Sequence, residues 1–149
     1  MAFYLNVLTG YRTEIEAGLG PTVLPVLLDS LDDHQGGRWE AAFRQQVRRL
    51  AASGGFGGRI VAVGPFWTAD GHNEIHVVAL SGRARTPVLV GEAKWAREVS
   101  APRLVAELYR KAAALPGAPH ELRLAICARE RVINLPEDVI AITAEDMFS

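Results

Sequence analysis

Apolar residues recur along the chain with two different periods, and the pattern predicts both helices and strands. Apolar positions three or four residues apart predict helices over residues 1–17, 22–33, 38–52 and 100–115. Shorter apolar runs predict strands over residues 59–66, 74–80, 87–95, 121–128 and 139–142. Thr143 and Asp146 have the spacing of a capping box, which predicts a short last helix.

The order of these elements indicates an α/β (α+β) fold. After two N-terminal helices the order is αβββαββ, and αβββαβ forms its core. A hairpin joined through a helix to later strands predicts a mixed central sheet with helices packed against it. Gly36 and Gly37 interrupt the helical pattern. We therefore expect a helical extension over residues 1–35, packed on a core domain over residues 36–149.

The strand predicted over residues 87–95 ends in two charged residues, Glu92 and Lys94. Side chains alternate between the faces of a strand, so these two share a face and point into the same space. A charge at the end of a buried strand needs a partner, a metal ion or water. The pair is therefore either a functional site or a structural ion pair.

The second and third predicted strands are expected to form an antiparallel hairpin. A turn centred near residue 83 pairs residues whose numbers sum to about 167, which sets Leu80 opposite Pro87 and His76 opposite Gly91 or Glu92. In the right parity, one face at one end of the hairpin carries Glu74, His76, Glu92 and Lys94. A slip of one residue would separate them.

Glu40 lies on the helix predicted over residues 38–52, whose apolar stripe includes Phe43 and Val47. It falls about 20° around the helix from Val47, at the margin of the buried face. Its carboxylate either points towards the sheet or complements the helix dipole in the first turn, which stabilises a helix by a few tenths of a kcal/mol.

Composition limits the function further. The chain has 149 residues, 49% hydrophobic and 22% charged, which is ordinary for one globular domain with a sizeable core. The net charge of −1 argues against a general electrostatic grip on nucleic acid or on an anionic membrane, so a DNA contact needs a local basic patch. The single cysteine, Cys127, lies in an apolar run and is expected to pack in the core of a cytoplasmic protein without membrane spans.

Several motifs together resemble the core of the PD-(D/E)xK nucleases. They are a helix with an acid, a strand that begins Glu-Ile, a strand that ends Glu-x-Lys, and a following helix. More narrowly, EIHVVAL, VLVGEAKW and AELYRKAAALP look like the nuclease-like C-terminal domain of a family of archaeal and bacterial P-loop ATPases. The ATPase module itself has no counterpart in these 149 residues.

The resemblance implies metal-dependent hydrolysis of DNA. It assigns Glu92 and Lys94 to catalysis, and it assigns a divalent cation, Mg²⁺ or Mn²⁺, to Glu40, Glu74, His76 and Glu92. At position 76 the family has an aspartate. An imidazole is a poorer ligand than a carboxylate for Mg²⁺, although it suits Mn²⁺ or Zn²⁺.

Basic residues on or near the helix that follows give a candidate nucleic-acid surface, formed by Arg97, Arg103 and Lys111. They are equally consistent with a solvated helix face. Two functions therefore stay open. One is a metal-dependent nuclease. The other is a nuclease-like fold without catalysis, serving as a binding module for DNA, for an ATPase partner or for a second copy of itself.

Overall fold

The computed structural model describes residues 8–149, and the first part of the helix predicted over residues 1–17 lies outside them. The remainder of that segment is an irregular helix, made of η1 (Leu8–Tyr11), α2 (Arg12–Glu14) and η2 (Ile15–Leu19). Gly18 has a φ of 87°, a left-handed conformation that glycine adopts without steric cost, and the helical path bends there. The following helix begins at Gly20.

The chain divides into two compact units, residues 1–38 and residues 39–149. The division falls inside one long helix, α3 (Gly20–Ala52). The prediction of separate helices with a break at Gly36 and Gly37 was therefore wrong. A glycine inside a helix costs only about 1 kcal/mol relative to alanine, and two such costs do not outweigh the favourable pattern on either side.

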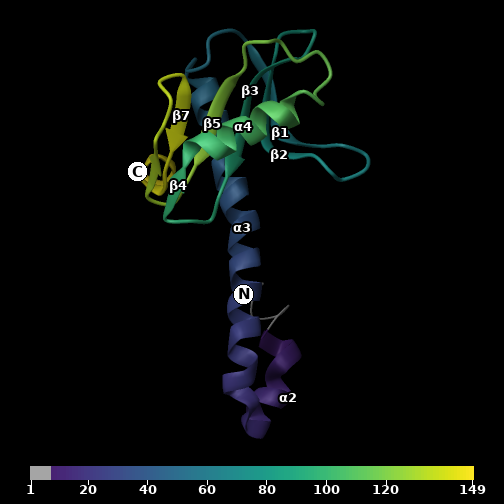
Figure 1. The fold of residues 1–149 in the computed structure, drawn as a ribbon, viewed down its shortest axis with the longest axis vertical. Helices are drawn as coiled ribbons and strands as arrows, with labels where there is room; N and C mark the ends of the chain where they lie inside the picture. Colours follow the sequence, from purple (N-terminus) through teal and green to yellow (C-terminus); the bar gives the residue numbers. More distant parts are fainter. Residues whose placement is uncertain (1–7) are drawn as a thin grey trace. The chain divides into compact units, whose positions relative to one another are not determined.

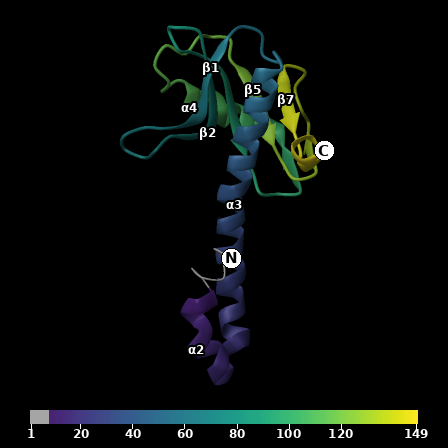
Figure 2. The same ribbon diagram turned by 180° about the vertical axis from the view of Figure 1, so that it is seen from behind.

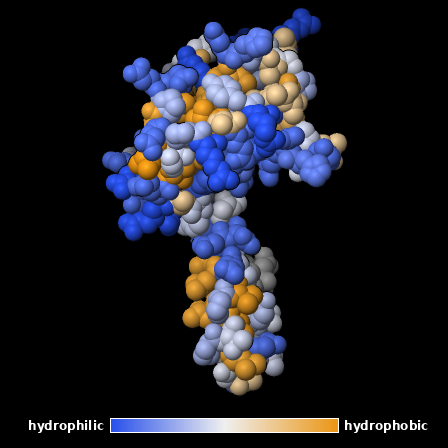
Figure 3. All heavy atoms as spheres, in the orientation of Figure 1, coloured by the Kyte–Doolittle hydropathy of each residue, from blue (hydrophilic) through white to orange (hydrophobic). Residues whose placement is uncertain are grey.

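The first unit exposes much of its apolar surface. Figure 3 shows hydrophobic residues on the surface of the described part of this unit. The exposed large side chains there are Ile15, Leu19, Leu24, Val26 and Leu28.

The second unit is a mixed sheet, as predicted (Figure 1). Its five strands lie in the order β1 (Ile60–Trp67), β2 (Glu74–Ser81), β3 (Thr86–Ala93), β5 (Arg123–Cys127) and β7 (Val139–Ile142). Strands β1, β2 and β3 pair antiparallel, whereas β3, β5 and β7 pair parallel. The parallel pairs need a crossover, which α4 (Ala101–Ala112) supplies between β3 and β5.

Helices cover both faces of this sheet. Residues 39–52 of α3 lie on one face (Figure 2), where Trp39, Phe43 and Val47 form the expected apolar stripe. Helix α4 lies on the other face (Figure 1), where Leu104 and Leu108 are buried against the strands. Each face therefore has its own apolar core, and the central strands are buried on both sides.

The β2–β3 hairpin has the predicted register near its turn, with Leu80 opposite Pro87. A register shift follows, after which Val78 pairs with Val90 and Val77 with Gly91. Continued by one residue, this register would set His76 opposite Glu92, one of its two expected partners.

A second irregularity lies between β1 and β2. Gly64 pairs with Val78 but Phe66 pairs with Ile75, so β2 holds one extra residue at His76 and Val77. This is the pattern of a β-bulge, which redirects the side chains on either side of it. Val77 accordingly packs in the core under α3, while Ile75 packs in the core under α4. Glu74, the neighbour of Ile75, takes the α3 face.

The pattern did not predict a small parallel sheet of β4 (Glu98–Ser100) and β6 (Arg131–Ile133). Each strand has only three residues, too few for a visible alternation. The last helix, α5 (Ala144–Phe148), begins with the predicted capping box of Thr143 and Asp146.

Cys127 is fully buried at the end of β5, and burial raises the pKa of its thiol to about 12. The thiol therefore stays protonated at pH 8, and we expect native protein not to react with a disulfide reagent at that pH. The same protein in concentrated urea should release one equivalent of chromophore, since the chain has one cysteine. Reaction of the native protein at the denatured rate would contradict this burial.

Candidate metal and phosphodiester site

Glu92 is the centre of the candidate site, and it is buried although charged. Its side chain is only 3% exposed at the end of β3, and two lysines hold its two oxygens. Lys94 Nζ lies 2.8 Å from Oε1, and Lys111 Nζ lies 3.2 Å from Oε2. A buried carboxylate needs such partners because desolvation of an unpaired charge is costly.

Lys111 was expected among the phosphate contacts, but the structure places it below the surface. Its side chain is 10% exposed on α4 and bridges Glu92 and Glu107. Glu107 and Lys111 are four residues apart on the helix, and Lys111 Nζ lies 3.3 Å from Glu107 Oε1. The hydrogen bond from Lys111 lowers the pKa of Glu107, so this carboxylate is ionised across the neutral range.

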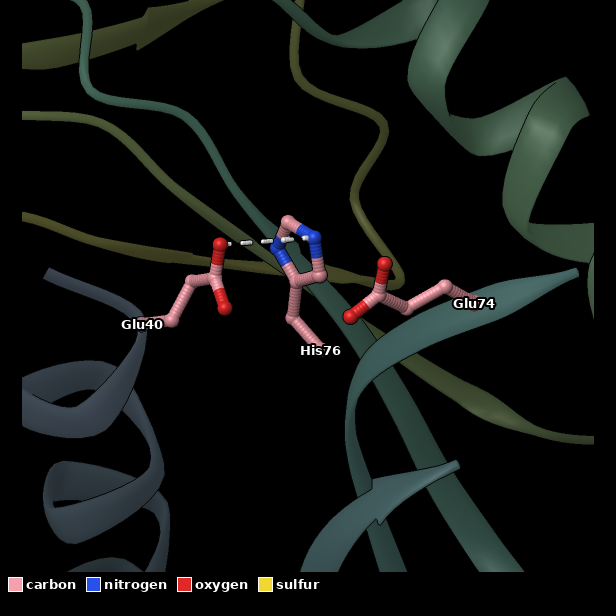
Figure 4. Close-up of side chains that lie close together, drawn as sticks. All are labelled: Glu40, Glu74 and His76. Atoms are coloured by element: carbon pink, nitrogen blue, oxygen red, sulfur yellow. Dashed lines mark ion pairs between the residues drawn. The ribbon is translucent and has the colours of Figure 1, made fainter. Parts of the chain in front are cut away.

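Three further side chains, Glu40, Glu74 and His76, lie close together (Figure 4), and His76 links them to Glu92. Glu40, Glu74 and His76 each place one possible ligand atom within 4.8 Å of the others. Glu40 comes from α3. Its side chain points towards the sheet, where its Oε1 lies 3.7 Å from His76 Nε2. Glu74 and His76 come from β2, where the bulge turns them towards α3.

His76 Nε2 lies between two carboxylates, 3.7 Å from Glu40 Oε1 and 3.8 Å from Glu92 Oε1. The other ring nitrogen, Nδ1, accepts a hydrogen bond from the backbone N–H of Ala93 at 3.1 Å. A neutral ring with this bond carries its proton on Nε2, so the N–H is directed at the acids. Arg44 fixes the same strand by donating to the His76 carbonyl oxygen at 3.0 Å.

The predicted site residues therefore divide into two groups. Glu40, Glu74, His76, Glu92 and Lys94 come together, but the bulge in β2, which the register did not predict, turns Glu74 and His76 towards Glu40. Arg97 lies outside this cluster, is exposed and pairs with Glu130 at 2.6 Å. Arg103 is also exposed, near the start of α4.

Two residues have places at the site that the sequence did not predict: Lys111 was expected as a nucleic-acid contact, and Trp67 was given no role. Lys111 enters the site because α4 crosses the sheet next to the end of β3, a tertiary contact that no local pattern reveals. Trp67, the last residue of β1, pairs directly with Glu74 and is 63% exposed. Its only sequence signal was a tryptophan at the predicted end of a strand.

The fold and the site define a mixed α+β domain with a cluster of acids, a histidine and two lysines at the end of its central strands. The chain belongs to the family DUF234, described as archaea bacterial proteins of unknown function, whose model matches residues 4–105. The matched range includes Glu40, Glu74, His76, Glu92 and Lys94, and it ends before Lys111. No curated protein and no solved structure matches the chain.

Within residues 8–149, no helix is both long enough and apolar enough to cross a membrane.

Proposed function

We propose that the unit of residues 39–149 hydrolyses phosphodiester bonds in DNA with the help of a divalent cation. One observation carries the proposal: the ammonium of Lys94 lies 2.8 Å from Glu92 beside the cluster of Glu40, Glu74 and His76. A lysine next to a group of acids is also what the resemblance to the PD-(D/E)xK nucleases implies. A carboxylate cluster with an adjacent lysine suits both cation binding and phosphate chemistry.

Glu40 and Glu74 offer carboxylate ligands within 4.8 Å of each other, and Glu92 Oε1 lies 3.8 Å from His76 of the same cluster. We assign the cation to Glu40, Glu74 and Glu92, a narrower set than the resemblance implies. His76 is left out because Ala93 N–H occupies its Nδ1 and the ring proton therefore lies on Nε2. When bound, the cation would supply a polarised phosphoryl oxygen and a bound water of lowered pKa.

The chain's own side chains perform the remaining roles. The side chain of Lys94 is 43% exposed, so its other N–H bonds are open to a phosphate oxygen, and Glu92 holds it in place. His76 directs its Nε2–H towards the carboxylates, where it can donate to a substrate oxygen. Lys111 is a positioning residue because it fixes the second oxygen of Glu92 and leaves the first to Lys94.

A second function is supported by the same geometry. The ammonium groups of Lys94 and Lys111 already supply positive charge and hydrogen bonds to Glu92, which is the role of a cation. A site satisfied in this way can persist without metal, as a nuclease-like fold that binds nucleic acid and does not cleave it.

Cleavage of plasmid and of single-stranded DNA with Mn²⁺ and with Mg²⁺ tests the proposal. We expect cleavage with Mn²⁺, reduced about a hundredfold or more in Lys94→Met because a charged donor to the phosphate is lost. Arg59→Met, which removes an exposed cation elsewhere, should cleave at the wild-type rate. His76→Asp should raise the activity with Mg²⁺, because it adds an oxygen ligand.

The same variants identify the second function. If wild type does not cleave DNA and His76→Asp does, the nuclease-like fold has lost catalysis through the change at this one residue. If neither protein cleaves DNA and neither binds Mn²⁺ by calorimetry, the nuclease proposal is overturned.

A further inference from the structure

Trp67 is a large apolar side chain that the fold leaves in solvent next to the candidate site. It is the last residue of β1 and the second most exposed large hydrophobic side chain among the described residues, at 63%. The other two tryptophans are placed differently, since Trp39 is buried and Trp95 is partly covered in an edge-to-face pair with it. An exposed indole offers a flat apolar face with a polar N–H, which suits contact with a ligand that is itself flat and partly polar.

The pairing of β1 with β2 fixes the place of this indole. Trp67 lies directly opposite Glu74, and side chains opposite each other in an antiparallel pair share a face with Cβ atoms about 5 Å apart. Its neighbour Phe66 packs in the core under α4, so Trp67 takes the opposite face. Glu74 is one of the three residues of the acid and histidine cluster, and the indole therefore stands beside that cluster.

Resting on the function proposed above, we propose that Trp67 is a stacking platform for an unpaired base next to the phosphodiester to be cleaved, and that the substrate is single-stranded at this position. An indole stacks on the face of any base, but only when that base is not stacked within a duplex. Arg110 supplies a cation at the same end of the hairpin. Its guanidinium donates to Asn73 Oδ1 at 3.1 Å, and Asn73 directly precedes Glu74.

Fluorescence anisotropy of a labelled oligothymidylate, in buffer with EDTA, tests the platform without any cleavage. We expect wild type to bind the single strand more tightly than a blunt duplex of the same length. Trp67→Leu should raise Kd for the single strand about tenfold, within the range of one lost aromatic stack, and leave duplex binding unchanged. Trp67→Phe should retain most of the affinity because it keeps an aromatic face.

Phe148→Leu is the matched control. Phe148 is 71% exposed and lies on α5, after the strand at the opposite edge of the sheet, so its loss should not change Kd. Equal affinities of wild type and Trp67→Leu, or no binding of the single strand by wild type, would overturn the proposal. So would self-association of wild type that Trp67→Leu abolishes without loss of oligonucleotide binding, since the indole would then belong to an interface between copies.

Failure of this proposal and failure of the nuclease proposal give different results. Cleavage that depends on Lys94 but not on Trp67 would overturn the platform alone. The protein could instead bind the single strand through Trp67 but neither cleave DNA nor bind Mn²⁺. That result would support the stacking platform and overturn the nuclease proposal.

Discussion

Lys111→Met is expected to destabilise the unit of residues 39–149 by about 3 kcal/mol. The change removes a positive charge from Glu92, whose side chain is 3% exposed, and removal of one partner from a buried ion pair costs about 3–5 kcal/mol. We expect the lower end of that range because Lys94 still contacts the other oxygen of Glu92. Urea unfolding followed by tryptophan emission measures the free energy, since all three tryptophans lie in this unit.

Lys94→Met is the matched control for this experiment. It removes the other ammonium from the same carboxylate, but its side chain is 43% exposed and water can replace it. We expect a loss below about 1 kcal/mol, as for other exposed ion pairs. The double variant Lys111→Met/Glu92→Met should recover much of the stability, since it removes both buried charges together. Equal losses in the two single lysine variants would contradict the assignment of Lys111 as the buried partner.

The order of core elements followed directly from the sequence because each strand and helix has a strong local pattern. The register of the hairpin could be predicted to within one residue, because a short turn fixes the register of its strands. From that register His76 was expected opposite Gly91 or Glu92, and His76 Nε2 lies 3.8 Å from Glu92 Oε1.

The parts that could not be predicted depend on contacts between distant segments. The bulge at His76 and Val77 is one example, because it arises in the pairing of β1 with β2 and leaves no periodic trace in β2 itself. Without the bulge, Glu74 and His76 would both lie on the α4 face of the sheet and point away from Glu40. The continuous helix through Gly36 and Gly37 is another example, since helix-breaking residues have a modest cost that a favourable context overcomes.

The role of Lys111 shows the same limit at the site. In the sequence, Lys111 is one of several basic residues on a helix. That pattern is consistent with a nucleic-acid surface and equally with a solvated helix face. Its helical position shows only that Glu107 is near. The contact with Glu92 joins residues 19 apart in sequence and depends on how α4 crosses β3. Stability and cleavage measurements on the two lysine variants therefore separate a positioning lysine from one that faces the substrate.

Gly91→Ala is expected to cost about 3 kcal/mol, although it adds a single methyl group. Gly91 directly precedes Glu92 in β3, and a Cβ at this position would lie 2.7 Å from Phe43 Cζ, 2.8 Å from Val77 Cγ1 and 2.8 Å from the carbonyl oxygen of Ala125. The first two contacts are with packed core side chains, and the third is with the backbone of the neighbouring strand β5. Extra volume in such a core typically costs 1–3 kcal/mol, and we expect the upper end because a backbone atom cannot rotate away.

Gly64→Ala is the control, because Gly64 lies on the edge strand β1 and a Cβ there meets no atom within 4 Å. We expect its stability to change by less than about 1 kcal/mol, since only the flexibility of the unfolded chain is affected. The two variants are compared by the same urea titration. Gly91→Ala should also lower Mn²⁺ affinity, because the shift needed to relieve the contacts moves the adjacent carboxylate of Glu92. A Gly91→Ala protein as stable as Gly64→Ala would show that α3 does not pack over β3 at this point. The position of Glu40 beside His76 would then also be contradicted, because it depends on the same packing.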